Sequence, residues 1–395
     1  MVHRPFFAAL AVLAGLCITL LAGCSSSRTP APAPRGAPAA APSAGPALAL
    51  LYTTPSGNLA LHDARAGTTA TWARDAAYEG VQATSPDGAQ LAFSYATADS
   101  ARLAVLDLRS LEIRHVDARA QPTTYSLAWH PKDGRLAYGY YTPAEDGSRG
   151  PGSLRVARPD GSTRPVGCRA VREVLHWLPT GALAGRDEDT LYLVAPSDCA
   201  TQASTDARRF NNPAYAPGGT ELAYIYYELT YNRSTGQYQP DSSLYLSDPA
   251  GQSGTQLLGP ERRVRHVRWS PDGTELAFDA QLDTTDRRQI AIYSLDTDRT
   301  VYLVPPGAAG RADQVQPRWS PSGTTVGFVH QSAQGRFAAA RVQGQTRRFG
   351  RTAGPVHWID EQTLAVPGPD SLRVTSLTGN VVHTQPAPAA VIHAW

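Results

Sequence analysis

The stretch W-S-P-D-G-T-E-L-A-F, at residues 269–278, decides the fold, because each of its positions has a structural reason. The aromatic residue ends one strand and is large enough to fill the space between neighbouring sheets. Ser-Pro-Asp-Gly suits a β-turn, since Pro fixes φ at the second position and Gly closes the turn. Leu-Ala-Phe then starts a second strand with apolar residues, as a sheet covered on both faces requires. The stretch therefore predicts two antiparallel strands joined by a tight turn.

The chain repeats this pattern. Successive copies begin about 38 to 54 residues apart, close to the length of one four-stranded propeller blade. A third and a fourth strand follow in each repeat, seen most clearly as Q-I-A-I-Y-S-L-D (289–296) and T-V-Y-L-V (300–304). The D-x-D between them is expected to be a hairpin turn, since it has too few oxygen ligands for calcium. The other copies are T-S-P-D-G-A-Q-L-A-F (84–93), W-H-P-K-D-G-R-L-A-Y (129–138), Y-A-P-G-G-T-E-L-A-Y (215–224) and W-S-P-S-G-T-T-V-G-F (319–328), with degenerate copies W-L-P-T-G-A-L-A-G (177–185) and W-I-D-E-Q-T-L-A-V (358–366).

The number of second strands predicts the number of blades. The sequence predicts an all-β fold, a single β-propeller of eight four-stranded blades; seven is the alternative if the weak unit at 174–199 forms no blade. No first strand precedes the first of these segments, whereas A-V-I-H-A-W (390–395) has the form of a first strand that ends in Trp395. We expect the two ends to pair in one blade and to close the ring without an exposed sheet edge. The second strands are L-A-L-L-Y (48–52), L-A-F-S-Y (91–95), R-L-A-Y-G (135–139), A-L-A-G-R (182–186), E-L-A-Y-I (221–225), E-L-A-F-D (275–279), T-V-G-F-V (325–329) and T-L-A-V-P (363–367).

The repeats resemble those of TolB-like, WD-repeat-like β-propellers and of the propeller domains in the prolyl oligopeptidase and dipeptidyl peptidase families. The resemblance covers residues 84–366 directly and the flanking segments more weakly. It implies the propeller fold and is unspecific for function. The peptidases carry their nucleophile on a separate hydrolase domain, and no G-x-S-x-G sequence of that domain occurs in this chain.

Residues 1–24 are expected to be a targeting signal rather than part of the fold. A basic start precedes an apolar run, and L-A-G-C (21–24) resembles the lipobox at which bacterial lipoproteins are cleaved and lipidated. The segment is thus predicted to be a lipoprotein signal peptide with Cys24 as the lipidated residue. An uncleaved membrane anchor is the alternative, since the apolar run is at the lower limit of a membrane-spanning length.

Residues 25–46 are rich in Pro and Ala, a composition that predicts a disordered, extended tether with a reach on the order of 60 Å. The propeller is then expected to occupy residues 47–395. The protein as a whole is predicted to be exported and anchored through lipid to a bacterial membrane, on its periplasmic or cell-surface side.

Charge and cysteine content narrow the classes of partner. The formal net charge of +2 over 395 residues gives no reason to expect nucleic acid as a partner. Cys168 and Cys199 are a candidate disulfide in an oxidising compartment, and a closed loop of about 30 residues would stabilise the fold by roughly 3–4 kcal/mol. Two free buried thiols are the alternative. A metal site is not expected, because the two cysteines lack the spacing of zinc ligands.

Sequence motifs for catalysis are missing. The chain contains no H-E-x-x-H, no P-loop and no Rossmann fingerprint, and no cofactor is predicted. Ser and Asp are frequent, but they fall mostly in turns, where local hydrogen bonding explains them. The sequence therefore identifies no catalytic residue and leaves enzymatic activity open.

Polar residues of the first strands are candidates for a ligand site, because these strands line the central channel of a propeller. A lopsided basic patch there could hold a carboxylate or a phosphate. The plainer interpretation is that a wet channel tolerates any polar residue. The candidates are His176, Arg268, Arg318 and His357, directly before the anchoring aromatic residue, and His266 and Gln316, two residues earlier on what is expected to be the same strand face.

Two connections between second and third strands are longer than the others, at residues 140–153 and 226–243. The second is rich in tyrosine, an amphipathic side chain favoured at protein and sugar interfaces. A long hairpin whose tyrosines pack on its own blade is the alternative. The candidate interface residues are Tyr226, Tyr227, Tyr231 and Tyr238.

The sequence thus predicts a lipid-anchored envelope module, which binds or scaffolds a protein, peptide or glycan through one propeller face and is expected to be monomeric. The alternative is a propeller enzyme, a lyase or hydrolase, that acts in the central channel. A cluster of carboxylates on the axis would favour the enzyme, and a flat aromatic face would favour the binding module.

Overall fold

The structure is a computed structural model, and it describes residues 49–394 apart from 55, 64–67, 120–123, 147–148, 167–170, 199, 207–209, 234–235, 282–286, 304–311 and 387–389. The chain divides into two compact units, Met1–Gly45 and Pro46–Trp395, and the described residues belong to the second. The predicted signal peptide with Cys24, the tether, both cysteines of the candidate disulfide and Trp395 lie outside the described residues. Within the described part, no helix is long and apolar enough to span a membrane.

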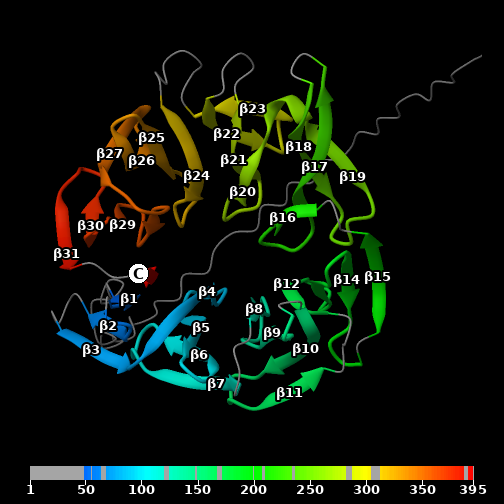
Figure 1. Cartoon of the computed structure of the whole chain (residues 1–395), viewed down its shortest axis with the longest axis vertical. Helices are drawn as coiled ribbons and strands as arrows, with labels where there is room; N and C mark the ends of the chain where they lie inside the picture. The colour runs from blue at the N-terminus through cyan, green and yellow to red at the C-terminus, as the bar shows by residue number, and fades with distance from the viewer. Residues whose placement is uncertain are drawn as a thin grey trace, which may run out of the picture. The chain divides into compact units, whose positions relative to one another are not determined.

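The second unit is a β-propeller of eight four-stranded antiparallel sheets, which confirms the predicted fold and blade number. The sheets follow one another around a ring, with the first strand of each repeat on the inner side (Figure 1). The weak unit at 174–199 forms a complete blade of its own. Among the described residues the helix η1 (Pro260–Arg262) is short and connects blades 5 and 6.

The blades are numbered in chain order. Blade 1 is β1 (Ala49–Thr53), β2 (Leu59–Asp63), β3 (Thr68–Ala73) and β32 (Ala390–Ala394); blade 2 is β4 (Ala76–Thr84), β5 (Gln90–Thr97), β6 (Ala101–Asp107) and β7 (Ile113–Arg119); blade 3 is β8 (Thr124–Trp129), β9 (Leu136–Pro143), β10 (Arg149–Ala157) and β11 (Thr163–Val166); blade 4 is β12 (Glu173–Trp177), β13 (Leu183–Arg186), β14 (Thr190–Val194) and β15 (Thr201–Asp206). Blade 5 is β16 (Phe210–Tyr215), β17 (Leu222–Asn232), β18 (Gln237–Ser247) and β19 (Gly254–Leu258); blade 6 is β20 (Arg265–Trp269), β21 (Glu275–Gln281), β22 (Arg288–Ser294) and β23 (Arg299–Tyr302); blade 7 is β24 (Asp313–Trp319), β25 (Val326–Ser332), β26 (Gly335–Val342) and β27 (Gln345–Arg351); blade 8 is β28 (His357–Trp358), β29 (Thr363–Pro367), β30 (Ser371–Ser376) and β31 (Val381–Pro386).

The two ends of the propeller pair in blade 1, as predicted. β32 lies antiparallel to β1, with Leu50 opposite Ala394 and Thr53 opposite Ala390. The sheet order is β3-β2-β1-β32, so that the last strand of the chain is the innermost strand of the first blade. The ring is therefore closed by main-chain hydrogen bonds.

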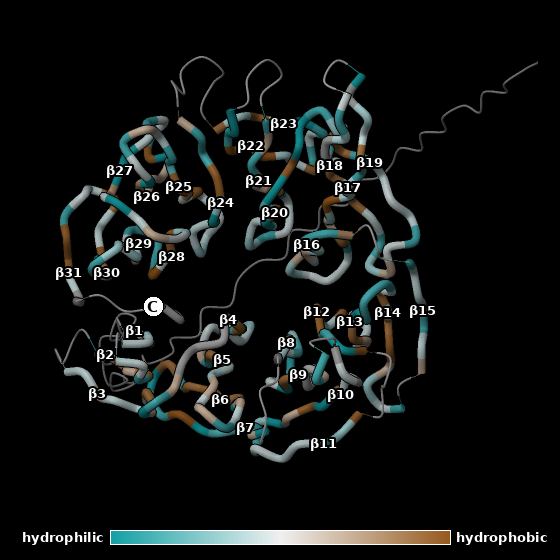
Figure 2. Tube along the Cα trace, viewed as in Figure 1, coloured by the Kyte–Doolittle hydropathy of each residue, from teal (hydrophilic) through white to brown (hydrophobic). Residues whose placement is uncertain are grey.

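The hydrophobic core consists of layers between neighbouring sheets. Ile225 of blade 5, for example, packs in one cluster with Val264 and Phe278 of blade 6, and all three are fully buried. Apolar stretches fall within the strands of the blades (Figure 2). Burial of each such side chain stabilises the fold by roughly 1.5–3 kcal/mol.

The tight turn of the repeat has the expected form. In the copy at 269–278 the N–H of Gly273 donates to the carbonyl of Ser270 at 3.0 Å, and Gly273 has a φ of +77°. The Ser270 hydroxyl donates to Asp272 at 2.6 Å and accepts from the N–H of Glu275 at 2.9 Å. Ser and Asp of the pattern therefore hold the turn together by side-chain hydrogen bonds.

The anchoring tryptophans do more than fill space. Their indole N–H groups donate to a main-chain carbonyl of the preceding blade, always that of the residue just before the anchor position. The bonds are Trp129 to Ala83 (2.8 Å), Trp177 to Ala128 (3.0 Å), Trp269 to Ala214 (2.7 Å), Trp319 to Arg268 (3.1 Å) and Trp358 to Arg318 (2.9 Å). Each of these tryptophans thus fixes the position of its blade relative to the preceding one.

Candidate functional site

Three of the predicted channel residues come from neighbouring blades and interact electrostatically. Arg268, Arg318 and His357 lie on the innermost strands β20, β24 and β28, directly before an anchoring tryptophan, and their side chains are half-buried. The carbonyls of Arg268 and Arg318 accept the indole N–H groups described above. The packing that joins the blades therefore also fixes the main chain from which the two guanidinium groups extend.

A cavity of about 310 Å³ lies beside Arg318 and His357, and Arg268 is not among the residues that line it. Side chains of blades 2, 6, 7 and 8 contribute to its wall, so that the cavity is on the inner side of the ring. The side-chain oxygen of Gln82 in this wall is buried and has no hydrogen-bond partner in the described part of the chain. The lining residues are Gln82, Pro271, Arg318, Trp319, Ser320, Pro321, Val356, His357 and Trp358.

The side chains of Arg268 and Arg318 give this region an excess of positive charge. Burial lowers the pKa of the Arg318 guanidinium to about 10, and the charge of Arg268 adds to this shift. Burial lowers the pKa of His357 to about 4, with the charge of Arg318 as the second cause. Burial also lowers the pKa of Arg268. Among the described residues no acidic side chain forms an ion pair with any of the three. At neutral pH both arginines are charged and have no counter-ion among the described residues, and His357 is neutral.

His176 lies apart from this cavity. It is on β12 of blade 4, and its ring stacks on Tyr215 of blade 5 with centroids 5.3 Å apart and planes 5° from parallel. Burial lowers the pKa of His176. It is not among the residues that line the cavity, and its described contacts are those of a side chain packed between blades.

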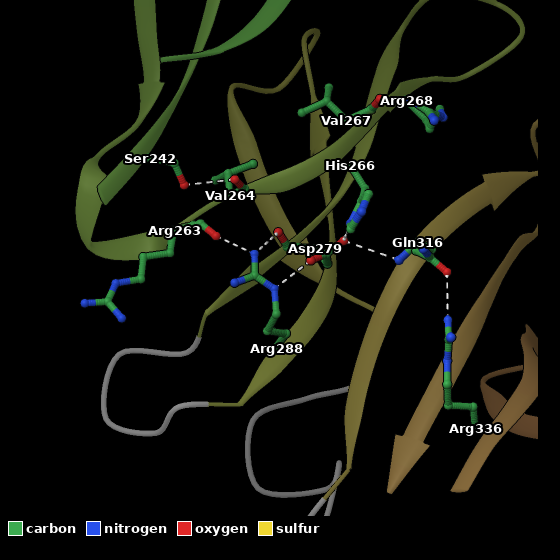
Figure 3. Close-up of polar contacts among 10 residues, drawn as sticks. All are labelled: Ser242, Arg263, Val264, His266, Val267, Arg268, Asp279, Arg288, Gln316 and Arg336. Carbon is green, nitrogen blue, oxygen red and sulfur yellow. Dashed lines mark hydrogen bonds and ion pairs between the residues drawn. The ribbon is translucent and has the colours of Figure 1, made fainter. Parts of the chain in front are cut away.

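His266 points away from the arginine that follows it, and Gln316 lies in a bulge of the same kind. A β-bulge interrupts the first strand of blade 6 between Arg265 and Arg268, and another lies before Arg318 in blade 7. His266 has a φ of +53° and Gln316 a φ of +59°, in the left-handed region that non-glycine residues rarely adopt. The bulge breaks the alternation of strand faces. As a result, His266 and Arg268 extend in different directions (Figure 3).

Asp279 is the centre of the network that His266 and Gln316 join. Its carboxylate is fully buried on β21, and Oδ2 accepts from Nε of Arg288 at 2.7 Å. Oδ1 accepts from Nδ1 of His266 at 2.6 Å and from the main-chain N–H of Gln316 at 3.3 Å. The Gln316 side-chain oxygen accepts in turn from Arg336 at 3.3 Å (Figure 3). The network links blades 6 and 7 around one buried negative charge.

Asp279 was not among the predicted site residues, although the repeats contain a signal for it. Asp279 lies opposite Arg265 in its blade, Ile225 opposite Asn211 in blade 5, and Val329 opposite Val315 in blade 7. Apolar residues fill the same place in the neighbouring blades, so the fold does not require a carboxylate there. Comparing the residue directly after L-A-F among the copies would have revealed it.

The tyrosine-rich connection is an extended hairpin rather than a loop. β17 and β18 pair as far as Asn232 opposite Gln237. Tyr226 packs on the hydrophobic cluster between blades 4 and 5, and Tyr227 packs on the cluster between blades 5 and 6. Tyr231 and Tyr238 form a cross-strand pair with ring centroids 5.2 Å apart, and they are 51% and 69% exposed. The four tyrosines thus divide into a packed pair and an exposed pair near the tip. The connection 140–153 is likewise occupied mostly by strands β9 and β10.

Comparison with known proteins shows the fold. No family model matches the chain. A segment of 117 residues is 30% identical to the uncharacterized peptidase YuxL of Bacillus subtilis (strain 168), which is 29% of this chain and only 16% of that protein. The chain is therefore related in sequence to a small part of a longer protein.

Solved structures extend the likeness over most of the chain. A eukaryotic initiation factor matches with a TM-score of 0.57 at 15% identity, over 88% of this chain and 97% of that one. The β-propeller domain of the Trilobed protease from Pyrococcus furiosus matches with a TM-score of 0.52 at 10% identity, over 80% and 96%. TolB from Acinetobacter baumannii is also among the similar structures, with a TM-score of 0.43 at 14% identity, over 86% and 79%. The match to the propeller of the Trilobed protease confirms the predicted resemblance to peptidase propellers, for the fold alone.

Proposed function

We propose that this protein is a binding module that takes a carboxylate- or phosphate-bearing ligand where Arg268, Arg318 and His357 meet. The observation that supports this most directly is a pair of partly buried arginines, of which Arg318 lines a cavity, with no acidic partner among the described residues. Desolvated like charges are unfavourable unless an anion balances them, and guanidinium groups bind oxyanions through two parallel hydrogen bonds. The unpartnered oxygen of Gln82 would accept from a hydroxyl of the same ligand.

The setting of this module is proposed from the sequence. Lipid on Cys24 anchors the protein to a bacterial membrane, and residues 25–46 separate the propeller from the bilayer. The ligand group then belongs to an envelope protein, peptide or glycan that reaches the channel. The chain acts as a monomeric propeller in this proposal, because one ring supplies all three basic side chains.

Calorimetry on the Arg268→Ala/Arg318→Ala variant tests the channel site. Citrate and inorganic phosphate serve as probes, because they present the two kinds of oxyanion. We expect saturable heat with the parent protein and a large decrease of that heat in the double variant, since both guanidinium groups are removed. Arg299→Ala, an exposed arginine of blade 6, is the matched control and should bind as the parent does. Identical heats for the double variant and the parent would overturn the proposal.

A lyase or hydrolase is the second candidate, and one observation favours it. The buried carboxylate of Asp279 holds Nδ1 of His266 at 2.6 Å, so that Nε2 is the nitrogen left to accept a proton. No hydrogen-bond partner of Nε2 occurs in the described part of the chain. Turnover of nitrophenyl glycosides and peptide anilides by the parent and by His266→Gln tests this. A general base predicts at least a hundredfold loss in the variant, and equal rates would contradict it.

A further inference from the structure

A second cavity, of about 340 Å³, lies between blades 3 and 4, away from the channel. Blade 3 contributes three arginines to its wall, and blade 4 contributes two turns. No acidic residue is part of the lining. The lining residues are Arg135, Val156, Arg158, Arg164, Val166, Thr180, Gly181, Ala182, Ala195, Pro196, Ser197 and Gln202.

Arg135 is held in place by two contacts. Its Nε donates to Asp133 at 2.8 Å, and its guanidinium lies over the ring of Trp177, 4.9 Å from the centroid. Asp133 is also in contact with His130, at 2.9 Å. Because Nε is already used, the terminal nitrogens of Arg135 are the ones left for a ligand.

Arg164 is also held, and Arg158 is exposed. A terminal nitrogen of Arg164 donates to the carbonyl of Ser197 in blade 4, which fixes the guanidinium across the gap between the blades. Neither Arg158 nor Arg164 forms an ion pair in the described part of the chain. The carboxylate near Arg158 is Asp160, which accepts instead from the N–H and hydroxyl of Ser162. Among the described residues Arg164 therefore has no counter-ion, and Arg158 has only the nearby charge of Asp160, with which it forms no ion pair.

The repeats show that the fold does not require a cation here. Arg135 is the seventh residue of its copy, and Gln90, Glu221, Glu275 and Thr325 hold that position in the other complete copies. Two of these residues carry the opposite charge. The arginine is thus particular to blade 3, beside the cavity where Arg158 and Arg164 also lie.

We propose that this cavity is a binding site for an anionic sugar, separate from the channel site. Arg158, Arg164 and the terminal nitrogens of Arg135 bind its phosphate or carboxylate. Thr180, Ser197 and Gln202 supply donors and acceptors for ring hydroxyls, and Val156, Val166 and Pro196 form an apolar wall against which a sugar ring packs. The cavity volume is at the small end of known ligand pockets, which suits one or two sugar units.

Calorimetry with four probes tests the site: glucose 6-phosphate, glucuronate, inorganic phosphate and glucose. We expect saturable binding of a charged sugar, with weaker heat for phosphate and none for glucose. The two charged sugars distinguish a phosphate source from a carboxylate source. Arg158→Gln/Arg164→Gln should weaken binding at least tenfold, and Arg299→Gln should not. Both mutated side chains are exposed, so the melting temperature of the double variant should equal that of the parent.

Two outcomes would overturn the proposal. One is the absence of saturable heat with either charged sugar at millimolar concentration. The other is parent-like affinity in Arg158→Gln/Arg164→Gln. If Arg318→Ala alone abolished the heat, the sugar would be bound in the channel, and the channel proposal would stand while this one failed. Binding that survives Arg318→Ala and is lost in the blade 3 variant supports this site whatever the result at the channel.

Discussion

At the scale of single residues, Asp279 shows how the ring departs from its own repeat. A buried carboxylate is costly unless it is paired and fully hydrogen-bonded. Asp279 meets this requirement through Arg288, His266 and the N–H of Gln316. Because the neighbouring blades place Ile225 and Val329 there, the charge serves the local network rather than the fold.

Replacing Asp279 alone should lower the free energy of unfolding far more than replacing Asp279 and Arg288 together. Asp279→Val leaves the Arg288 guanidinium buried without its carboxylate, and loss of one partner of a buried pair typically costs about 3–5 kcal/mol. Asp279→Val/Arg288→Leu removes both charges and should recover most of that loss. Urea denaturation of the two variants measures the difference in free energy of unfolding. Equal losses in the single and the double variant would show that the ion pair is not the cause.

His357 should make the protein less stable in acid. Its pKa is about 4 in the folded protein and near 6.5 in the unfolded chain, because burial and Arg318 disfavour the charged form. Between these values the unfolded state binds more protons, so the free energy of unfolding falls as the pH falls from about 6.5 to about 4. Thermal unfolding of the parent and of His357→Asn over this range checks it. The variant should lose stability less steeply, and parallel curves would contradict the prediction.

At the scale of elements, the first strands show what sequence could and could not predict. The turn, the anchoring aromatic residue and the apolar second strand follow from residue type, so the repeat predicts the blade. The bulges do not follow from residue type, because Asn212, His266 and Gln316 take up left-handed conformations at positions where no glycine signals them. Simple alternation then places His266 beside Arg268, whereas the bulge directs it to Asp279. Asp279 was missed because it continues a buried strand, where an acid is unexpected.

Tyrosine substitutions in the β17–β18 hairpin should have two different effects. Those at the packed base should lower the free energy of unfolding, and those near the tip should leave it nearly unchanged. Tyr227 packs on the cluster between blades 5 and 6, so Tyr227→Ala should lower the free energy of unfolding by about 2 kcal/mol. Tyr231→Ser/Tyr238→Ser changes only exposed side chains and should stay within about 0.5 kcal/mol of the parent. Denaturant unfolding measures both. A large loss in the second variant would mean that the tyrosines near the tip pack against the propeller.

At the scale of the whole molecule, closure of the ring depends on five residues of β32. Their pairing with β1 gives blade 1 its innermost strand, and without it one blade has an open edge. The indole hydrogen bonds between blades also stabilise the closed ring, because each joins one sheet to the next. The stability of each blade therefore depends on its neighbours, and loss of β32 from blade 1 should destabilise the whole ring.

Deletion of residues 388–395 should lower the melting temperature sharply, because β1 loses its partner and the ring opens. The matched control is deletion of residues 1–46, which leaves every strand in place and should leave the melt unchanged. Differential scanning calorimetry of the two truncated proteins makes the comparison. An unchanged melt for the protein without residues 388–395 would show that the ring does not need β32.

The pairing of β1 with β32 also orders events during biosynthesis. Of the eight blades, blade 1 begins to be translated first but is completed last, since its innermost strand β32 follows the strands of the other seven in the sequence. Every prematurely terminated product therefore exposes the main-chain edge of β1, which can pair with other chains. Only polypeptides that include β32 hide that edge, so proteases that recognise exposed strands would remove the products that lack it.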